Sequence, residues 1–145
     1  MQLRQYTYFA VTSTELTADA ITTRLGIAPD EVAVRGSKRT DPPVPTAHRW
    51  EVHADGEGRI DDQLAALVAR LVPIQHLLQQ LVAEGHRCGL HVVRTFGEGE
   101  AEAHPPTGEL VVISGQHQLL GWHLERSVIA FLAATGIELD VDEYG

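Results

Sequence analysis

The chain has 145 residues, of which 43% are hydrophobic and 21% are charged, as in an ordinary globular protein. That length fits one domain with a sizeable core, so we predict a single domain over residues 1–145. The formal net charge of −9 argues against a nucleic-acid partner, because phosphates repel an acidic protein. The chain has a lone cysteine, no stretch of 18 apolar residues and no visible signal peptide. We therefore expect a soluble cytoplasmic protein without a membrane partner.

The N-terminal end is predicted to contain a strand, a capped helix and a second strand. Residues 3–12 alternate and are rich in aromatic and β-branched side chains, which favours a strand. Thr17 can cap a helix over residues 18–25, because its hydroxyl can accept from a free amide of the first turn. Gly26 stands where a left-handed residue ends a helix, and residues 31–35 form the next strand.

The middle of the chain is predicted to contain a loop, a third strand and the longest helical stretch. Residues 36–47 carry three prolines and few apolar side chains, so they form neither a helix nor a central strand. Residues 48–54 alternate at period two, which predicts a strand. Helical periodicity continues over residues 60–82, where Pro73 predicts a kink or two abutting helices.

The C-terminal part is predicted to contain three strands and one helix. Residues 86–96 and 108–113 are strands, and the second is nearly continuously apolar, which suggests burial on both faces. Ser114 can cap a helix over residues 116–135. Residues 137–142 alternate between apolar and acidic side chains, which predicts a terminal strand with one solvent-exposed face.

The predicted order of elements is β-α-β-β-α-β-β-α-β. Interleaved strands and helices without glycine-rich turns favour an α+β fold, with a mixed or antiparallel sheet and helices on one face. The first six elements have the split βαβ order of ferredoxin-like folds, and the last three can extend that sheet.

Short motifs are spread over nearly the whole chain. They are Tyr8-Phe9-Ala10-Val11, Leu25-Gly26-Ile27-x-Pro29, Gly36, Trp50 and the ending Glu138-Leu139-Asp140-Val141-Asp142-x-Tyr144. Together they resemble a bacterial family, the domain of unknown function 4279, although Glu143 stands where members have an apolar residue. The resemblance implies a small intracellular domain with no assigned activity and supplies no catalytic residue. Some members resemble immunity proteins of bacterial toxin systems.

The first candidate site is a cationic loop that could hold a phosphate or carboxylate group. Its cations, two hydroxyls and backbone amides surround Gly36, and a tryptophan could form one wall. The candidate ligand-binding residues are Arg35, Ser37, Lys38, Arg39, Arg49 and Trp50. The alternative is a solvated charged loop beside a tryptophan that belongs to the core.

The second candidate site is the acidic end of the chain, which could dock a basic protein partner. The candidate partner-binding residues are Glu138, Asp140, Asp142 and Glu143. Alternating acids on a strand are otherwise its solvent-exposed face.

Motifs for metal binding or nucleophilic catalysis are not found in the sequence. The eight histidines show no HExxH pattern, and His48 and His53 are expected to point to opposite faces of their strand. Cys88 shares a strand face with His86, but a packed thiol is the default interpretation. We therefore predict no metal, no cofactor and no catalytic residue.

Three hypotheses for function follow. The first is a protein-binding or regulatory module, with a toxin-immunity-like role against a basic partner as one form of it. The alternative is a domain that binds a small anion or acts on it as an enzyme, using residues 35–49. The third is a structural homodimer formed through a free edge strand. Because no catalytic motif is found, we favour binding over catalysis.

Overall fold

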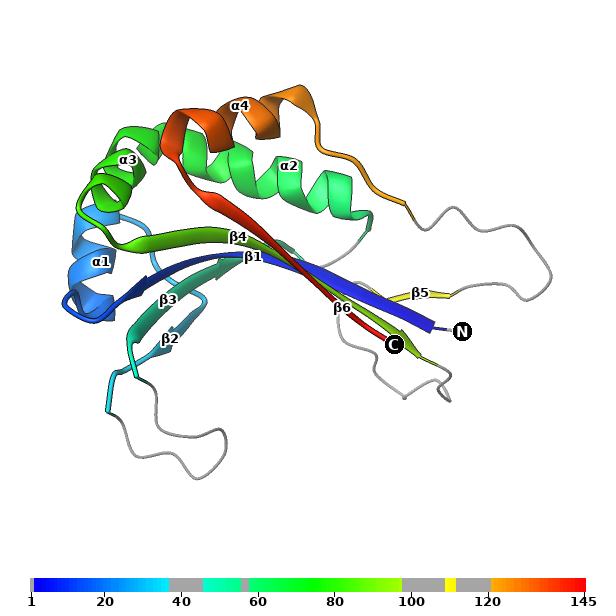
Figure 1. The fold of residues 1–145 in the computed structure, drawn as a ribbon, viewed down its shortest axis with the longest axis horizontal. Helices are drawn as coiled ribbons and strands as arrows, with labels where there is room; N and C mark the ends of the chain where they lie inside the picture. The colour runs from blue at the N-terminus through cyan, green and yellow to red at the C-terminus, as the bar shows by residue number, and fades with distance from the viewer. Residues whose placement is uncertain (1, 37–45, 56–57, 98–108, 112–120) are drawn as a thin grey trace.

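The computed structural model describes residues 2–36, 46–55, 58–97, 109–111 and 121–145. Within them, one sheet is covered on one face by helices (Figure 1). Its strands are β1 (Gln2–Ser13), β2 (Glu31–Ala33), β3 (His48–His53), β4 (Arg87–Gly97), β5 (Glu109–Val111) and β6 (Glu138–Tyr144). The helices are α1 (Ala18–Leu25), α2 (Ile60–Leu71), the 3-10 helix η1 (Val72–Ile74), α3 (Gln75–Ala83) and α4 (Arg126–Thr135). The predicted α+β class is confirmed.

The strands follow the order β2-β3-β1-β4-β6, and β5 pairs with the N-terminal end of β1. All described neighbours are antiparallel except β4 and β6, which run parallel. The first four strands therefore have the arrangement of a split βαβ fold, with β1 in the centre between β3 and β4. The parallel strand β6 follows helix α4, which supplies the crossover that a parallel pair needs.

The core lies between the sheet and the helices. Because side chains alternate along a strand, Phe9 of β1, Trp50 of β3 and Leu90 of β4 all face the helices. Each of these three side chains is fully buried, and the Phe9 and Trp50 rings meet edge to face, with centroids 6.3 Å apart. The interpretation of Trp50 as a core residue is confirmed.

Helix α1 begins and ends as the sequence predicts. The Thr17 Oγ1 accepts a hydrogen bond from the Ala20 backbone N at 3.2 Å, which satisfies one free amide of the first turn. Gly26 follows the last helical residue with φ of 72°, a conformation that glycine adopts at low cost.

The helical stretch Ile60–Ala83 is interrupted where Pro73 predicts it, because η1 separates α2 from α3. By length and a mean hydropathy of 1.2 alone, this stretch is apolar enough to cross a membrane. Its apolar side chains instead pack into the core, and Leu64, Leu71 and Leu78 are fully buried. The burial pattern is that of an amphipathic helical stretch with one face packed on the core.

Helix α4 begins later than predicted. Residues 121–125 are not helical, and α4 starts at Arg126; Ser114 and residues 112–120 lie outside the described residues. The buried Asp61 carboxylate accepts from the His123 backbone N at 3.1 Å and lies 2.7 Å from its Nδ1. These contacts hold the segment in an extended form, in which Trp122 and Leu124 pack against the core. Helical periodicity could not reveal this long-range tether.

Candidate functional site

The face of the sheet opposite the helices is uncovered by any described element (Figure 1). We call it the open face. Alternation places Tyr6, Tyr8, Ala10 and Thr12 of β1 on it, and pairing brings the matching residues of β3 and β4 beside them. Because β6 pairs in parallel with β4, Asp140 joins the same face opposite His91.

A hollow of about 230 Å³ lies in the open face. Its described lining comes from four strands and consists of Ala10, Thr12, Arg49, Arg87, Gly89, His91 and Asp140. Ala10 and Gly89 are directly paired neighbours on β1 and β4. These two small residues leave the space that longer polar side chains surround, so the hollow is small, polar and open to solvent.

Gly89 makes room for the imidazole of His91. A Cβ at position 89 would lie 3.0 Å from the His91 Nε2, closer than real Cβ contacts normally allow. The His91 ring cannot easily retreat, because it stacks on Tyr8 with centroids 4.6 Å apart and planes 9° apart. Glycine at position 89 therefore shapes both the hollow and the position of its histidine.

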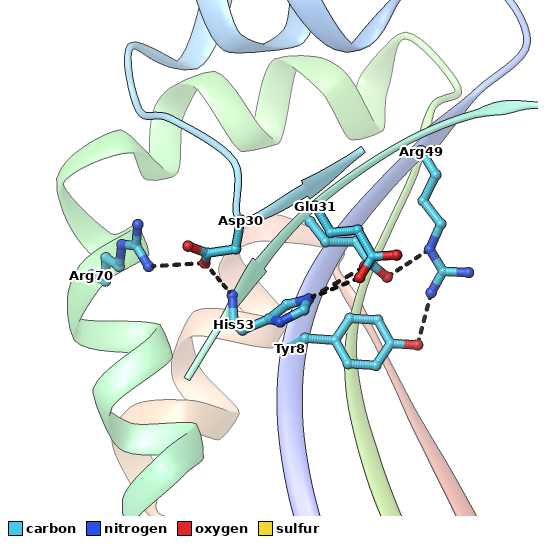
Figure 2. Close-up of polar contacts among 7 residues, drawn as sticks. Tyr8, Asp30, Glu31, Arg49, His53 and Arg70 are labelled. Carbon is cyan, nitrogen blue, oxygen red and sulfur yellow. Dashed lines mark hydrogen bonds and ion pairs between the residues drawn. The ribbon is translucent and has the colours of Figure 1, made fainter. Parts of the chain in front are cut away.

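Arg49 is held in place by two neighbours (Figure 2). Its Nη2 donates to the Tyr8 hydroxyl at 2.7 Å, and its Nε lies 2.8 Å from the Glu51 Oε1. Burial lowers the pKa of Arg49, but Glu51 and Tyr8 more than offset this and leave it raised. The guanidinium is a fixed, preoriented cation at one wall of the hollow.

Arg87 stands at the opposite wall and is held more weakly. Its Nε lies 3.6 Å from the Glu138 Oε2, and its Nη2 lies 3.7 Å from the Asp140 Oδ2. The side chain is 69% exposed, and such long contacts in solvent contribute little. The Arg87 guanidinium can therefore turn toward a bound group at small cost.

Two aromatic groups at the hollow are neutral near pH 7: His91 of its lining, and Tyr8, whose ring stacks on His91. Burial lowers the pKa of His91 below 6.5, although Asp140, whose Oδ2 lies 3.7 Å from the His91 Nδ1, opposes this. Burial also raises the pKa of Tyr8 above 10.0, so its hydroxyl stays protonated. The hollow thus offers two cations, neutral donors and one carboxylate to a ligand.

A second polar cluster lies beside Arg49, on β2 and β3 (Figure 2). The His53 Nε2 lies 3.3 Å from the Glu51 Oε2 and 4.0 Å from the Glu31 Oε2. The His53 backbone N donates to the Asp30 Oδ2 at 2.7 Å, and that carboxylate lies 3.8 Å from the Arg70 Nη1. We call Glu31, Glu51 and His53 the carboxylate–histidine cluster; these are the donors that could hold a metal ion.

The predicted cationic loop is only partly described. Ser37, Lys38 and Arg39 lie outside the described residues. The Arg35 Nη1 donates to the Thr14 carbonyl at 3.1 Å, and Arg35 does not line the hollow. Arg49 does line it.

The prediction of Trp50 as the wall of a ligand site is wrong. Its side chain is fully buried on the helical side of β3, and its Nε1 donates to the Thr22 Oγ1 at 3.0 Å. A core tryptophan packed in this way cannot contact a ligand on the open face.

The four acidic residues of the terminal strand do not share one face. Glu138, Asp140 and Asp142 alternate onto the open face, whereas Glu143 points to the other side. There its Oε1 accepts from the Arg94 Nη1 at 2.8 Å. Glu143 therefore does not share the face of the other three candidate partner-binding residues, and Arg87 partly neutralises Glu138 and Asp140.

The cysteine is a packed core residue. Cys88 is 3% exposed, and burial raises the pKa of its thiol to about 12. A thiol that stays protonated at neutral pH is a poor nucleophile, which agrees with the packed-cysteine interpretation.

Sequence reasoning missed the hollow because its members come from four strands. Alternation along β3 places Arg49 on the open face, together with Glu51 and His53, which lie beside the hollow and do not line it. The neighbours Tyr8, His91 and Asp140 depend on strand order, which local patterns do not reveal.

The described residues form an α+β fold with a hollow lined by polar side chains on an uncovered sheet face. The sequence model of the family described as "Domain of unknown function (DUF4279)" matches residues 2–145, so the chain belongs to this family. Neither a curated protein nor a solved structure matches the chain.

Proposed function

We propose that this protein is a cytoplasmic binding module that takes a small molecule with a carboxylate or phosphate group in the hollow of the open face. The observation that carries the proposal is the placement of Arg49 and Arg87 on opposite walls of a hollow of about 230 Å³. Guanidinium groups bind carboxylates and phosphates through paired, charge-assisted hydrogen bonds.

The other lining residues indicate what else the ligand carries. The Thr12 hydroxyl and the His91 imidazole can each donate to or accept from the ligand. Asp140 accepts hydrogen bonds and would repel a second negative group near it. The hollow therefore suits a ligand with one anionic end and a hydrogen-bond donor beside it. The described lining includes neither serine nor cysteine, and we assign binding rather than catalysis.

The variant Gly89→Ala tests this proposal. We expect inorganic phosphate or a small carboxylate such as glycine to bind the wild type saturably, measured by calorimetry. The added methyl group would occupy part of the hollow and crowd the His91 ring. The affinity of the variant for the anion should therefore fall about tenfold or more.

The matched control is Gly97→Ala on the same strand, where a Cβ meets no atom within 4 Å. It should bind like the wild type. The proposal is overturned when the wild type binds none of these anions, or when Gly89→Ala binds them as tightly as Gly97→Ala does.

A second candidate function, docking of a basic protein, is favoured by the exposed edge strand β6. It ends the strand order, so one side of its backbone is unpaired in the described structure. The side chains of Val141 and Tyr144 are 42% and 57% exposed. Asp142 adds a negative charge on the open face. An extended segment of a basic partner, or β6 of a second copy, could add to this edge.

The variant Val141→Lys should abolish such docking, because an inward-facing or edge lysine blocks strand addition. Ile129→Lys on α4 is the control, since Ile129 is similarly exposed at 51%. Capture from a bacterial lysate, with sedimentation to detect dimers, should show loss of a basic partner or of the dimer only with Val141→Lys. Equal capture and equal mass for both variants contradict this candidate.

A further inference from the structure

We propose that the carboxylate–histidine cluster is a binding site for a divalent transition-metal cation such as Zn²⁺. This site is separate from the hollow and does not require a ligand there. Its members are Glu31 of β2 and Glu51 and His53 of β3, whose donor atoms all lie within 4.8 Å of one another.

A bound cation would offset the repulsion between the two carboxylates of the cluster. Glu31 and Glu51 are directly opposite each other on antiparallel strands, a placement in which like charges repel and destabilise a sheet. The Glu51 side chain is only 9% exposed, so water screens it poorly. Arg49 offsets part of this charge, but it lies against the Oε1 of Glu51. The Oε2 points instead toward His53, at 3.3 Å.

The distances between the donor atoms are close to those around a bound metal ion. Donor atoms about 2.1 Å from a tetrahedral metal ion lie about 3.4 Å from one another. The His53 Nε2 is 3.3 Å from the Glu51 Oε2 and 4.0 Å from the Glu31 Oε2. Only Glu31 must approach, and it is free to do so because its side chain is 63% exposed.

Neighbouring groups hold His53 in place. The Asp30 Oδ2 accepts from the His53 backbone N at 2.7 Å and fixes the chain at that point. The Tyr8 ring lies beside the imidazole, with centroids 5.8 Å apart and planes 58° apart. Figure 2 shows the imidazole pointing toward the Glu31 carboxylate, and its Nε2 also lies 3.3 Å from the Glu51 Oε2.

The donor set selects the class of ion. One imidazole nitrogen and two carboxylate oxygens suit zinc and its neighbours better than magnesium or calcium, which prefer oxygen alone. Three protein donors leave one tetrahedral position for water or a ligand atom. Glu51, as a ligand of the ion, would also contact Arg49, which lines the hollow.

Zinc uptake by the full chain tests the inference. The probe is ZnCl₂ added at pH 7.5 in a non-phosphate buffer, followed by calorimetry and by native mass spectrometry for the stoichiometry. We expect one zinc per chain, and affinity lowered on the order of tenfold or more in Glu31→Gln and His53→Gln. Both side chains are partly exposed, so these variants keep the fold, which a thermal melt verifies.

The matched control is Glu125→Gln, which removes the same charge from an exposed position before α4. It should take up zinc like the wild type. The inference is overturned when the wild type takes up no zinc, or when Glu31→Gln and His53→Gln bind it as tightly as the control. Gly89→Ala should retain zinc binding, so loss of anion binding and loss of zinc binding are distinguished.

Discussion

His91 couples the packing of the open face to its charge. The ring lies against Tyr8, above the glycine at position 89, and burial holds the pKa of the imidazole below 6.5. The unfolded chain therefore binds a proton at this residue more readily than the folded chain does. The contribution of neutral His91 to stability is fully present above pH 6.5 and is lost progressively as the pH falls toward its lower folded pKa.

We predict that His91→Gln flattens this part of the pH profile of stability. The measurement is the urea midpoint of unfolding between pH 7.5 and pH 5. The wild type should lose stability toward acid more steeply than the variant, because only the wild type must protonate a buried imidazole. His76→Gln, at an exposed position on α3, should keep the wild-type slope. Equal slopes for His91→Gln and the wild type would contradict the prediction.

Single residues also show how far sequence reasoning reaches. Alternation along β3 correctly places Trp50 on the face opposite Arg49 and Glu51. It cannot identify Tyr8 as the acceptor for Arg49, because that contact joins strands far apart in the chain. The chemistry of a site on a sheet depends on such cross-strand neighbours, so its members were predictable only within one strand.

Two helices end on glycines with nearly the same backbone conformation. Gly26 after α1 has φ of 72°, and Gly136 after α4 has φ of 74°. Their surroundings differ. A Cβ at position 26 meets no atom within 4 Å, whereas one at position 136 would lie 3.1 Å from the Val82 Cγ1 of α3. A side chain at position 26 would therefore meet backbone strain alone, whereas one at position 136 would also be crowded by α3.

We predict that Gly26→Ala lowers the free energy of unfolding by about 1–2 kcal/mol, which is the cost of left-handed backbone for a residue with a Cβ. Gly136→Ala should cost more, because α3 must also shift away from the new methyl. Chemical denaturation of both variants measures the difference. Equal losses would mean that the contact between α4 and α3 yields without cost.

For helices and strands, the sequence was informative where the structure depends on neighbouring residues. Caps, glycine ends and Pro73 gave α1 and the interruption between α2 and α3. The beginning of α4 was not predictable, because the tether between Asp61 and His123 is a contact between distant segments. Elements whose limits depend on tertiary contacts lie beyond periodicity and capping rules.

For the whole molecule, interleaved strands and helices were sufficient to predict the α+β class. The position of β1 between β3 and β4 was expected only through the split βαβ order. The parallel pairing of β6 with β4 had no local signal, since alternation describes a strand and not its neighbour. The open face, which depends on all these pairings, was therefore visible only in the structure.

The central position of β1 also determines when the protein can fold. β1 precedes the other strands of this sheet in the chain and is the strand around which the sheet is built, yet its longest partner, β4, lies in the second half of the 145 residues. Such pairing between distant segments folds slowly, because the intervening chain must be ordered first. During synthesis the apolar side of β1 therefore stays exposed to chaperones and to other nascent chains until β4 has emerged from the ribosome.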